Sequence, residues 1–139
     1  MDLALFDFDG TITQGDSWKP FLRMAVGPAR KAVAYTVLFP VGIGYYAKLV
    51  KGRTARPLFA HVAFRGVDAL RVRALGERYA RDVLPATIRP RATAQIAWHQ
   101  RRGDTVVVVS GSLAMYVQPW CEREGVDSIA TDWKSVQVD

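Results

Sequence analysis

Two aspartates near the N-terminus are the strongest candidates for chemistry in this sequence. Asp7 and Asp9 lie at the end of the apolar run LALFDF, residues 3–8, and Asp9-Gly10 is typical of a turn. Alternation along a strand directs both side chains towards the same side. Two carboxylates this close repel each other unless a cation or a shared proton lies between them, which suggests a hard, oxygen-seeking ion such as Mg²⁺. A polar turn alone would need only one of these carboxylates.

A second apolar run, Thr105 to Val109, contains four consecutive valines and is followed by Ser110-Gly111-Ser112. Both runs are short and end at turn residues, as buried parallel strands do. Open α/β sheets bind their ligands at the carboxyl ends of such strands, where the two aspartates are expected to lie. The serines have a simpler explanation as helix caps, and Ser112 is the expected N-cap of a helix over 112–124 that Gly125 closes.

The remaining pattern predicts how these runs are positioned. A helix over 90–103 precedes the second strand, and a third strand over 128–131 follows the next helix, which is the order of a parallel α/β sheet. About eighty residues of helical character separate the first strand from this unit, too many for an ordinary crossover. We therefore expect an α/β core over residues 1–16 and 87–139, with a helical cap inserted over 17–86.

Composition excludes several classes of protein. Half of the 139 residues are hydrophobic and 23% are charged, so the chain can bury a core. Cys121 is the single cysteine, which excludes an intramolecular disulfide and a cysteine-rich zinc site. The first residues lack the basic leader of a secretory signal. A cytoplasmic location is the expectation.

The net charge of +6 is concentrated in the middle of the chain, where residues 51–102 hold twelve basic and three acidic side chains. Such a segment attracts anions, including nucleic acid, acidic lipid headgroups and phosphorylated metabolites. A solvated helix face explains part of this positive charge. Apolar residues recur at helical spacing along one side of the helix, and the arginines lie on its other sides; the apolar residues are Val72, Leu75, Tyr79 and Val83. The segment lacks aromatic residues interleaved with basic ones, so no nucleic-acid binding is expected.

Residues 32–47 of the expected cap carry no charge and are bracketed by Arg30-Lys31 and Lys48. Sixteen residues interrupted by Pro40 are too few for a simple membrane span. Two alternatives remain. The favoured one is a bent pair of buried helices, and the other is a hydrophobic element in a membrane interface, with basic residues at the headgroups.

The motif Asp-Phe-Asp-Gly-Thr at 7–11 resembles the first motif of the haloacid dehalogenase superfamily, and the strand ending in Ser110-Gly111 resembles the second. The helical insert between them is similar to that of subfamily IB, which includes phosphoserine phosphatases and phosphatidylglycerophosphatase C. The resemblance covers essentially the whole chain. It implies an α/β fold with a parallel Rossmann-like sheet and an inserted all-helical cap.

The resemblance also implies roles for residues in a Mg²⁺-dependent phosphomonoester hydrolase. Asp7 would be the nucleophile that forms an aspartyl phosphate, and Asp9 the general acid and base. Both would bind Mg²⁺, Asp9 through its backbone carbonyl. Phosphate would be held by Gly10, Thr11, Ser110 and Gly111.

The substrate would be a phosphorylated small molecule or a lipid phosphate. Asp16 lies where phosphoserine phosphatases carry an acidic residue that binds the substrate's amino group, or it is the N-cap of the first cap helix. The basic cap and its uncharged run 32–47 favour a lipid phosphate, with peripheral contact at the inner face of the membrane. A phosphoserine phosphatase-like enzyme is the alternative.

Two further motifs of the superfamily, a lysine and an acidic pair, are not recognisable. Lys134 follows Ser110 too soon, and Asp132 and Asp139 lack the expected Gly-Asp context. The chain is therefore similar to the front part of a longer enzyme and is expected to be weakly active or inactive by itself. Its first strand would have an open edge suited to self-association. A non-catalytic phosphate-binding or regulatory module is the competing interpretation.

Overall fold

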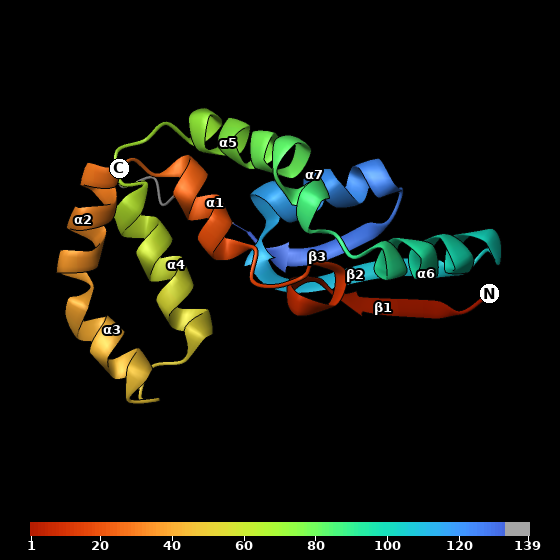
Figure 1. The fold of residues 1–139 in the computed structure, drawn as a ribbon, viewed down its shortest axis with the longest axis horizontal. Helices are drawn as coiled ribbons and strands as arrows, with labels where there is room; N and C mark the ends of the chain where they lie inside the picture. The colour runs from red at the N-terminus through yellow and green to blue at the C-terminus, as the bar shows by residue number, and fades with distance from the viewer. Residues whose placement is uncertain (133–139) are drawn as a thin grey trace.

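The computed structural model describes residues 1–132, apart from the side chains of residues 52–57. Within this range three strands form one sheet, and helices fill the connections (Figure 1). In chain order the elements are β1 (Leu3–Asp7), a turn (Phe8–Ile12), α1 (Trp18–Ala25), α2 (Pro28–Val37), α3 (Phe39–Tyr46), α4 (Gly52–Ala63), α5 (Ala69–Asp82), a 3-10 turn (Leu84–Thr87), α6 (Pro90–Arg101), β2 (Thr105–Leu113), α7 (Ala114–Glu124) and β3 (Asp127–Thr131).

The sheet is parallel, with the strand order β1-β2-β3. Residues of β1 pair with β2 from Leu3 opposite Thr105 to Asp7 opposite Val109. The predicted parallel α/β fold is confirmed. One boundary differs from expectation, since β2 does not stop at Val109 but continues to Leu113, with a register irregularity between these two residues.

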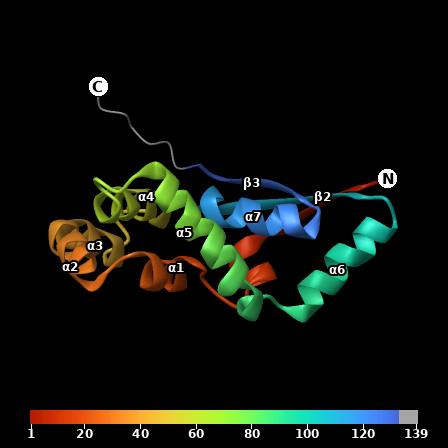
Figure 2. The same cartoon turned by 90° about the horizontal axis from the view of Figure 1, so that it is seen from above.

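The two faces of the sheet have different surroundings. Helices α6 and α7 lie on one side of it (Figure 2), and the side chains that point to this side, including Val106 and Val108, are buried. Alternation sends Leu3, Leu5 and Ile129 to the other side, where each is 63% exposed. In the described part of the chain, the sheet is therefore covered on one face.

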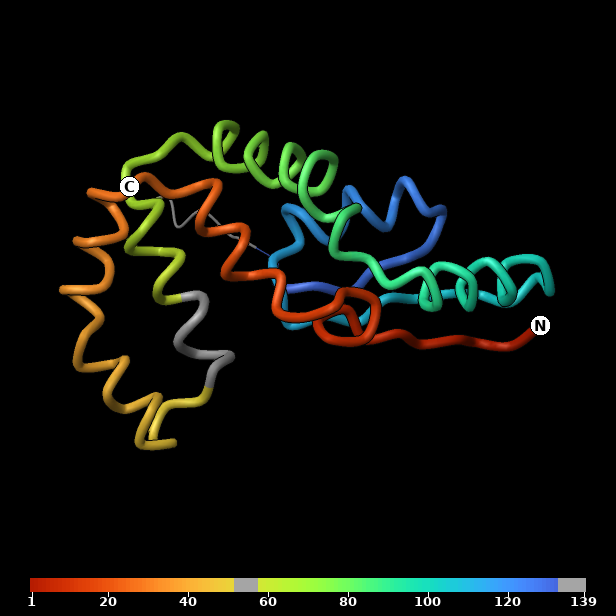
Figure 3. The backbone as a smooth tube through the Cα atoms, in the orientation of Figure 1, coloured from red at the N-terminus to blue at the C-terminus, as the bar shows by residue number. Residues whose placement is uncertain are grey.

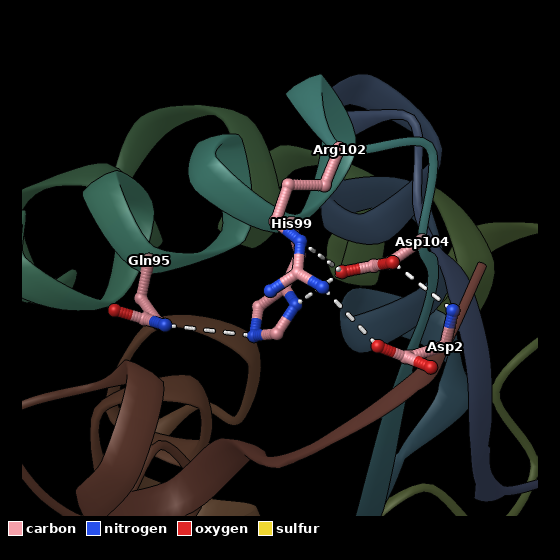
Figure 4. A network of polar contacts seen from close by, with 5 residues as sticks. All are labelled: Asp2, Gln95, His99, Arg102 and Asp104. Carbon is pink, nitrogen blue, oxygen red and sulfur yellow. Dashed lines mark hydrogen bonds and ion pairs between the residues drawn. The ribbon is translucent and has the colours of Figure 1, made fainter.

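A polar network fixes the amino ends of β1 and β2 (Figure 4). The Asp104 carboxylate accepts hydrogen bonds from His99 Nδ1 at 2.9 Å and from the Asp2 backbone N–H at 3.0 Å. Arg102 adds ion pairs to Asp104 at 3.5 Å and to Asp2 at 3.2 Å. These contacts, the one with His99 above all, hold the pKa of the Asp104 carboxyl below its usual value.

The helices between β1 and α6 extend from the core (Figure 1). Helices α1 and α5 reach back to α7 through three buried rings, with Phe21 lying 5.4 Å from Tyr79 and 5.0 Å from Tyr116 between ring centroids. Helix α5 approaches α7 closely at Gly76, because a Cβ there would lie 2.3 Å from the backbone oxygen of Met115. The limits 17–86 for the cap stay a prediction.

The uncharged segment 32–47 forms a pair of helices, as expected, but the prediction that this pair is buried is wrong. Ala34 is its one fully buried residue, whereas Tyr35 and Phe39 are 63% and 66% exposed. Pro40 lacks a backbone N–H and lies in the first turn of α3, which explains why the chain breaks here into two helices. No helix in residues 1–132 is long and apolar enough to cross a membrane.

Candidate active site

The turn after β1 is held by a residue outside the expected motif. Gly10 has a φ of 78°, which glycine adopts without strain. The backbone N–H of Thr13 donates to Phe8 O at 3.0 Å, and the buried Thr13 hydroxyl donates to Gly15 O at 2.6 Å. The same hydroxyl accepts the Gly10 N–H at 3.2 Å. Thr13 thereby fixes the loop that carries the two aspartates.

Asp7 and Asp9 are placed in different surroundings. Asp7 is exposed at the carboxyl end of β1, and the Thr11 hydroxyl donates to its Oδ2 at 3.4 Å. Asp9 is half-buried, and its Oδ1 accepts the backbone N–H of Ser17 at 2.9 Å and the Ser17 hydroxyl at 2.5 Å. Asp7 is thus open to a ligand, whereas Asp9 is held by hydrogen bonds within the protein.

The serine motif lies at the same edge of the sheet. Ser110 follows Val109, the residue paired with Asp7, and its buried hydroxyl accepts the Ser112 N–H at 3.0 Å. Gly111 is exposed, and its carbonyl accepts the Thr131 hydroxyl at 3.0 Å. Both phosphate-binding candidates of the second motif therefore lie next to the strand that ends in Asp7.

Ser112 is not the helix cap that the sequence predicted. It belongs to β2, and α7 begins two residues later, at Ala114, with Leu113 at the N-cap position. The Ser112 hydroxyl donates to Asp9 Oδ2 instead. The irregular end of β2 brings it to Asp9, so this serine joins the two motifs.

A network of buried hydroxyls lies behind Asp9. The Ser17 hydroxyl, which donates to Asp9, lies 3.1 Å from the Tyr116 hydroxyl, and the Tyr79 hydroxyl donates to the Ser17 carbonyl at 2.8 Å. Burial raises the pKa of both tyrosines, so the phenols remain protonated. Sequence reasoning missed Ser17 and Tyr116. The requirement that a buried tyrosine hydroxyl finds a partner could have indicated the second of them.

Asp16 contributes to the start of the first cap helix. Its Oδ1 accepts the Trp18 backbone N–H at 3.0 Å, while Ser17 occupies the N-cap position itself. The structure thus supports a capping role for the Asp16 side chain, although Ser17 and not Asp16 is the N-cap residue. A role for Asp16 in substrate binding stays a prediction.

The donors at this edge fit part of a magnesium site. Mg²⁺ takes oxygen ligands and keeps several waters and substrate oxygens, so one or two protein oxygens suffice. The exposed Asp7 carboxylate and the backbone carbonyl of Asp9 are suitable ligands of this kind. Among residues 1–132 there is no group of three or more acidic, histidine or cysteine side chains that could hold a metal. Asp132 is exposed, and Lys134 and Asp139 lie outside the described residues.

A parallel sheet with an aspartate motif at residues 7–11 and a serine motif at residues 110–111 is typical of the haloacid dehalogenase-like hydrolases. The sequence profile of the haloacid dehalogenase-like hydrolases matches residues 4–137. The chain belongs to this family.

Individual proteins are similar to this chain in sequence or in fold. Protein CicA of Caulobacter vibrioides is 28% identical over 125 residues, a match that covers 90% of this chain and 55% of CicA. A protein of unknown function from Bordetella pertussis Tohama I has a similar structure, with a TM-score of 0.77 and 24% identity, over 98% of this chain and 62% of that protein. A substrate-bound phosphoserine phosphatase shares the fold, with a TM-score of 0.58 and 19% identity, over 94% of this chain and 55% of its own length. The chain thus spans about half the length of the curated relative it matches.

Proposed function

We propose that this chain provides the nucleophile and the phosphate-binding loops of a Mg²⁺-dependent phosphomonoester hydrolase. The observation that carries the proposal is the hydrogen bond from Ser112 to Asp9, because it joins the two motifs at one edge of the sheet. Asp7 pairs with Val109, the residue before Ser110, which supports a joint role for Asp7 as nucleophile and Ser110 as phosphate ligand. Family membership, with phosphoserine phosphatases among its structural neighbours, supports the same reaction class.

In the proposed reaction, a carboxylate oxygen of Asp7 attacks phosphorus and the bond from phosphorus to the ester oxygen breaks. Asp9 gives its proton to the leaving alkoxide. A water molecule then attacks the aspartyl phosphate and loses a proton to Asp9, which releases inorganic phosphate and restores the Asp7 carboxylate. Thr11 orients Asp7 through the hydrogen bond at its Oδ2.

The phosphoryl oxygens would be held by donors from both loops. Thr11 of the first loop and Ser110 and Gly111 of the second are the candidates, and fixed donors of this kind stabilise developing negative charge. The Gly10 N–H already donates to the Thr13 hydroxyl, so Gly10 would shape the turn around the phosphate. Mg²⁺ would neutralise the charges of the phosphate and of Asp7 as they approach each other. Ser17 and Ser112 hold the Asp9 side chain, so its proton is transferred from a defined position.

A lipid phosphate is the substrate class that we favour. The observation in its favour is the apolar exposed surface of α2 and α3, which a small soluble substrate does not need. A small phosphomonoester such as phosphoserine is the second candidate. The capping bond of Asp16 to Trp18 N–H weighs against it, since this carboxylate already has a structural task. Action at the inner face of the membrane fits the lipid substrate.

The test is Mg²⁺-dependent hydrolysis of p-nitrophenyl phosphate by this chain and by a version extended to the natural stop codon of its gene. Asp7→Asn should lower the rate at least about a thousandfold. Asp127→Asn is the matched control, because Asp127 is an exposed aspartate at the opposite end of a strand. Folded protein without activity in either form would favour a phosphate-binding module, and equal rates for Asp7→Asn and wild type would refute the mechanism.

A further inference from the structure

The outermost part of the cap has a surface whose chemistry the hydrolase site does not use. It consists of α2, α3 and the loop 47–51, here called the outer cap face, and it lies at the edge of the molecule away from the sheet (Figures 1 and 3). We propose that the outer cap face docks on the surface of a bilayer that contains anionic lipids. The docking uses none of the residues of the proposed reaction, but it rests on the proposed lipid-phosphate substrate and deepens it, because both are argued from the same surface.

Large apolar side chains are exposed along this face. Tyr46 and Leu49 are 91% and 83% exposed, and Phe39 and Ile43 are more than half exposed. Helix α3, Phe39–Tyr46, has no fully buried residue although it contains no charged one. Contiguous apolar surface of this kind marks a site of interaction. Tyrosines are favoured at the boundary between lipid and water, where the ring is apolar and the hydroxyl is hydrated.

An apolar cavity of about 610 Å³ adjoins this face and is lined by residues of α2, α3 and α4. Phe59 of α4 contributes to its wall, with its ring centroid 5.1 Å from that of Tyr35. The other walls come from α3 and its two ends, including Leu38, Val41 and Ile43. A cavity lined in this way offers a hydrocarbon chain more contact than a flat surface would.

The charges around the face complement anionic headgroups. Residues 17–67 contain nine basic and no acidic residues. Exposed Lys48 and Lys51 follow α3, and Arg30 lies at the start of α2 with its guanidinium bonded to the Arg65 carbonyl at 2.9 Å, a neutral partner. Lys48 has a φ of 60°, a conformation that glycine adopts more easily, so this position carries a lysine despite backbone strain. Basic residues beside an apolar surface are attracted to acidic lipids.

The charge pattern also separates a bilayer from a second copy of this chain. Two outer cap faces brought together would join two surfaces that carry basic and no acidic residues, and like charges across an interface are unfavourable. A helix that spans the membrane is not an option for the described residues, since none is long enough. Short helices with one exposed apolar side instead lie in the plane of the interface.

The experiment is flotation of the protein with vesicles of phosphatidylcholine, with or without phosphatidylglycerol. We expect binding only with phosphatidylglycerol, and weaker binding as salt is raised. The double variant Phe39→Ser/Tyr46→Ser should lower the vesicle affinity at least about tenfold, and Lys48→Glu/Lys51→Glu should do the same without removing apolar surface. Leu70→Ser is the matched control, because Leu70 is 74% exposed on α5, outside the outer cap face. It should bind as wild type does.

Three results would overturn the proposal. They are absence of wild-type binding, equal binding to vesicles without phosphatidylglycerol, and unchanged binding of both double variants. The face would instead be assigned to self-association if the wild-type protein is a dimer that does not bind vesicles and the variant Phe39→Ser/Tyr46→Ser is a monomer. Circular dichroism checks that each variant is folded. Asp7→Asn should bind vesicles normally, so loss of catalysis and loss of docking are distinguishable.

Discussion

The inner and outer parts of the helical insert use similar aromatic side chains in opposite ways. In the inner part, Phe21 of α1 and Tyr79 of α5 are fully buried and pack against Tyr116 of α7, which belongs to the core. In the outer part, Phe39 and Tyr46 of α3 are mainly exposed. The comparison teaches that the same residue types build a rigid support near Asp9 and an open surface far from it.

The physical difference lies in what the polar atoms contact. The inner tyrosine hydroxyls bond to Ser17, and the Ser17 hydroxyl bonds to Asp9, so packing and site geometry are coupled. The outer rings of Phe39 and Tyr46 are 66% and 91% exposed, so most of their surface contacts solvent. Changes in the inner part should therefore affect stability and activity, whereas changes in the outer part should affect surface binding alone.

The largest expected difference is between two phenylalanines. Phe21→Ala removes a fully buried ring from contacts with four others and should lower the free energy of unfolding by about 3–5 kcal/mol. Phe39→Ala, at a position 66% exposed, should change it by less than about 0.5 kcal/mol. Urea unfolding measures both. Equal losses would show that α3 is part of the core.

Two helical glycines give the next contrast. Gly76→Ala should destabilise the protein by about 1–3 kcal/mol, because the new Cβ would meet the Met115 backbone and push α5 away from α7. Gly42→Ala on α3 meets no atom within 4 Å and should stabilise the helix by up to about 1 kcal/mol. Thermal unfolding followed by circular dichroism measures the two shifts, and a stabilising Gly76→Ala would refute the close α5–α7 contact.

The smallest contrast concerns single hydroxyl groups. Tyr116→Phe keeps the ring but removes a partner of Ser17, and it should cost about 1 kcal/mol of stability. It should also lower kcat more than it raises KM, since Ser17 then holds Asp9 less firmly. Tyr46→Phe at the exposed end of α3 is the control and should change neither quantity. An unchanged kcat in Tyr116→Phe would separate this network from the reaction.

Local patterns in the sequence were sufficient to predict the frame of the site. The apolar runs before Asp7 and Ser110 indicated β1 and β2, because buried strands leave a continuous apolar signal. Gly125 closes α7 with a φ of 68°, as its position after Glu124 predicted. These features depend on neighbours within a few residues, so the local sequence is sufficient to predict them.

Contacts between distant segments were not predictable in this way. Ser112 lies 103 residues from Asp9, and no periodicity in the sequence marks their hydrogen bond. Ser112 was assigned to a helix cap because a serine before a helix is usually one, but the irregular end of β2 carries it elsewhere. The prediction that α2 and α3 are buried was wrong for a related reason. Apolar composition indicates that a segment needs a contact but does not say which partner supplies it.

The most direct test of the account is to trap the phosphate on the protein. The full-length protein is mixed with p-nitrophenyl phosphate and Mg²⁺, quenched in acid, reduced with borohydride and mapped by mass spectrometry. An aspartyl phosphate at Asp7 is reduced to homoserine, so the account predicts homoserine at position 7 and its absence in Asp7→Asn. Hydrolysis without any modification of Asp7, or with modification of another carboxylate, would contradict the assignment of the nucleophile.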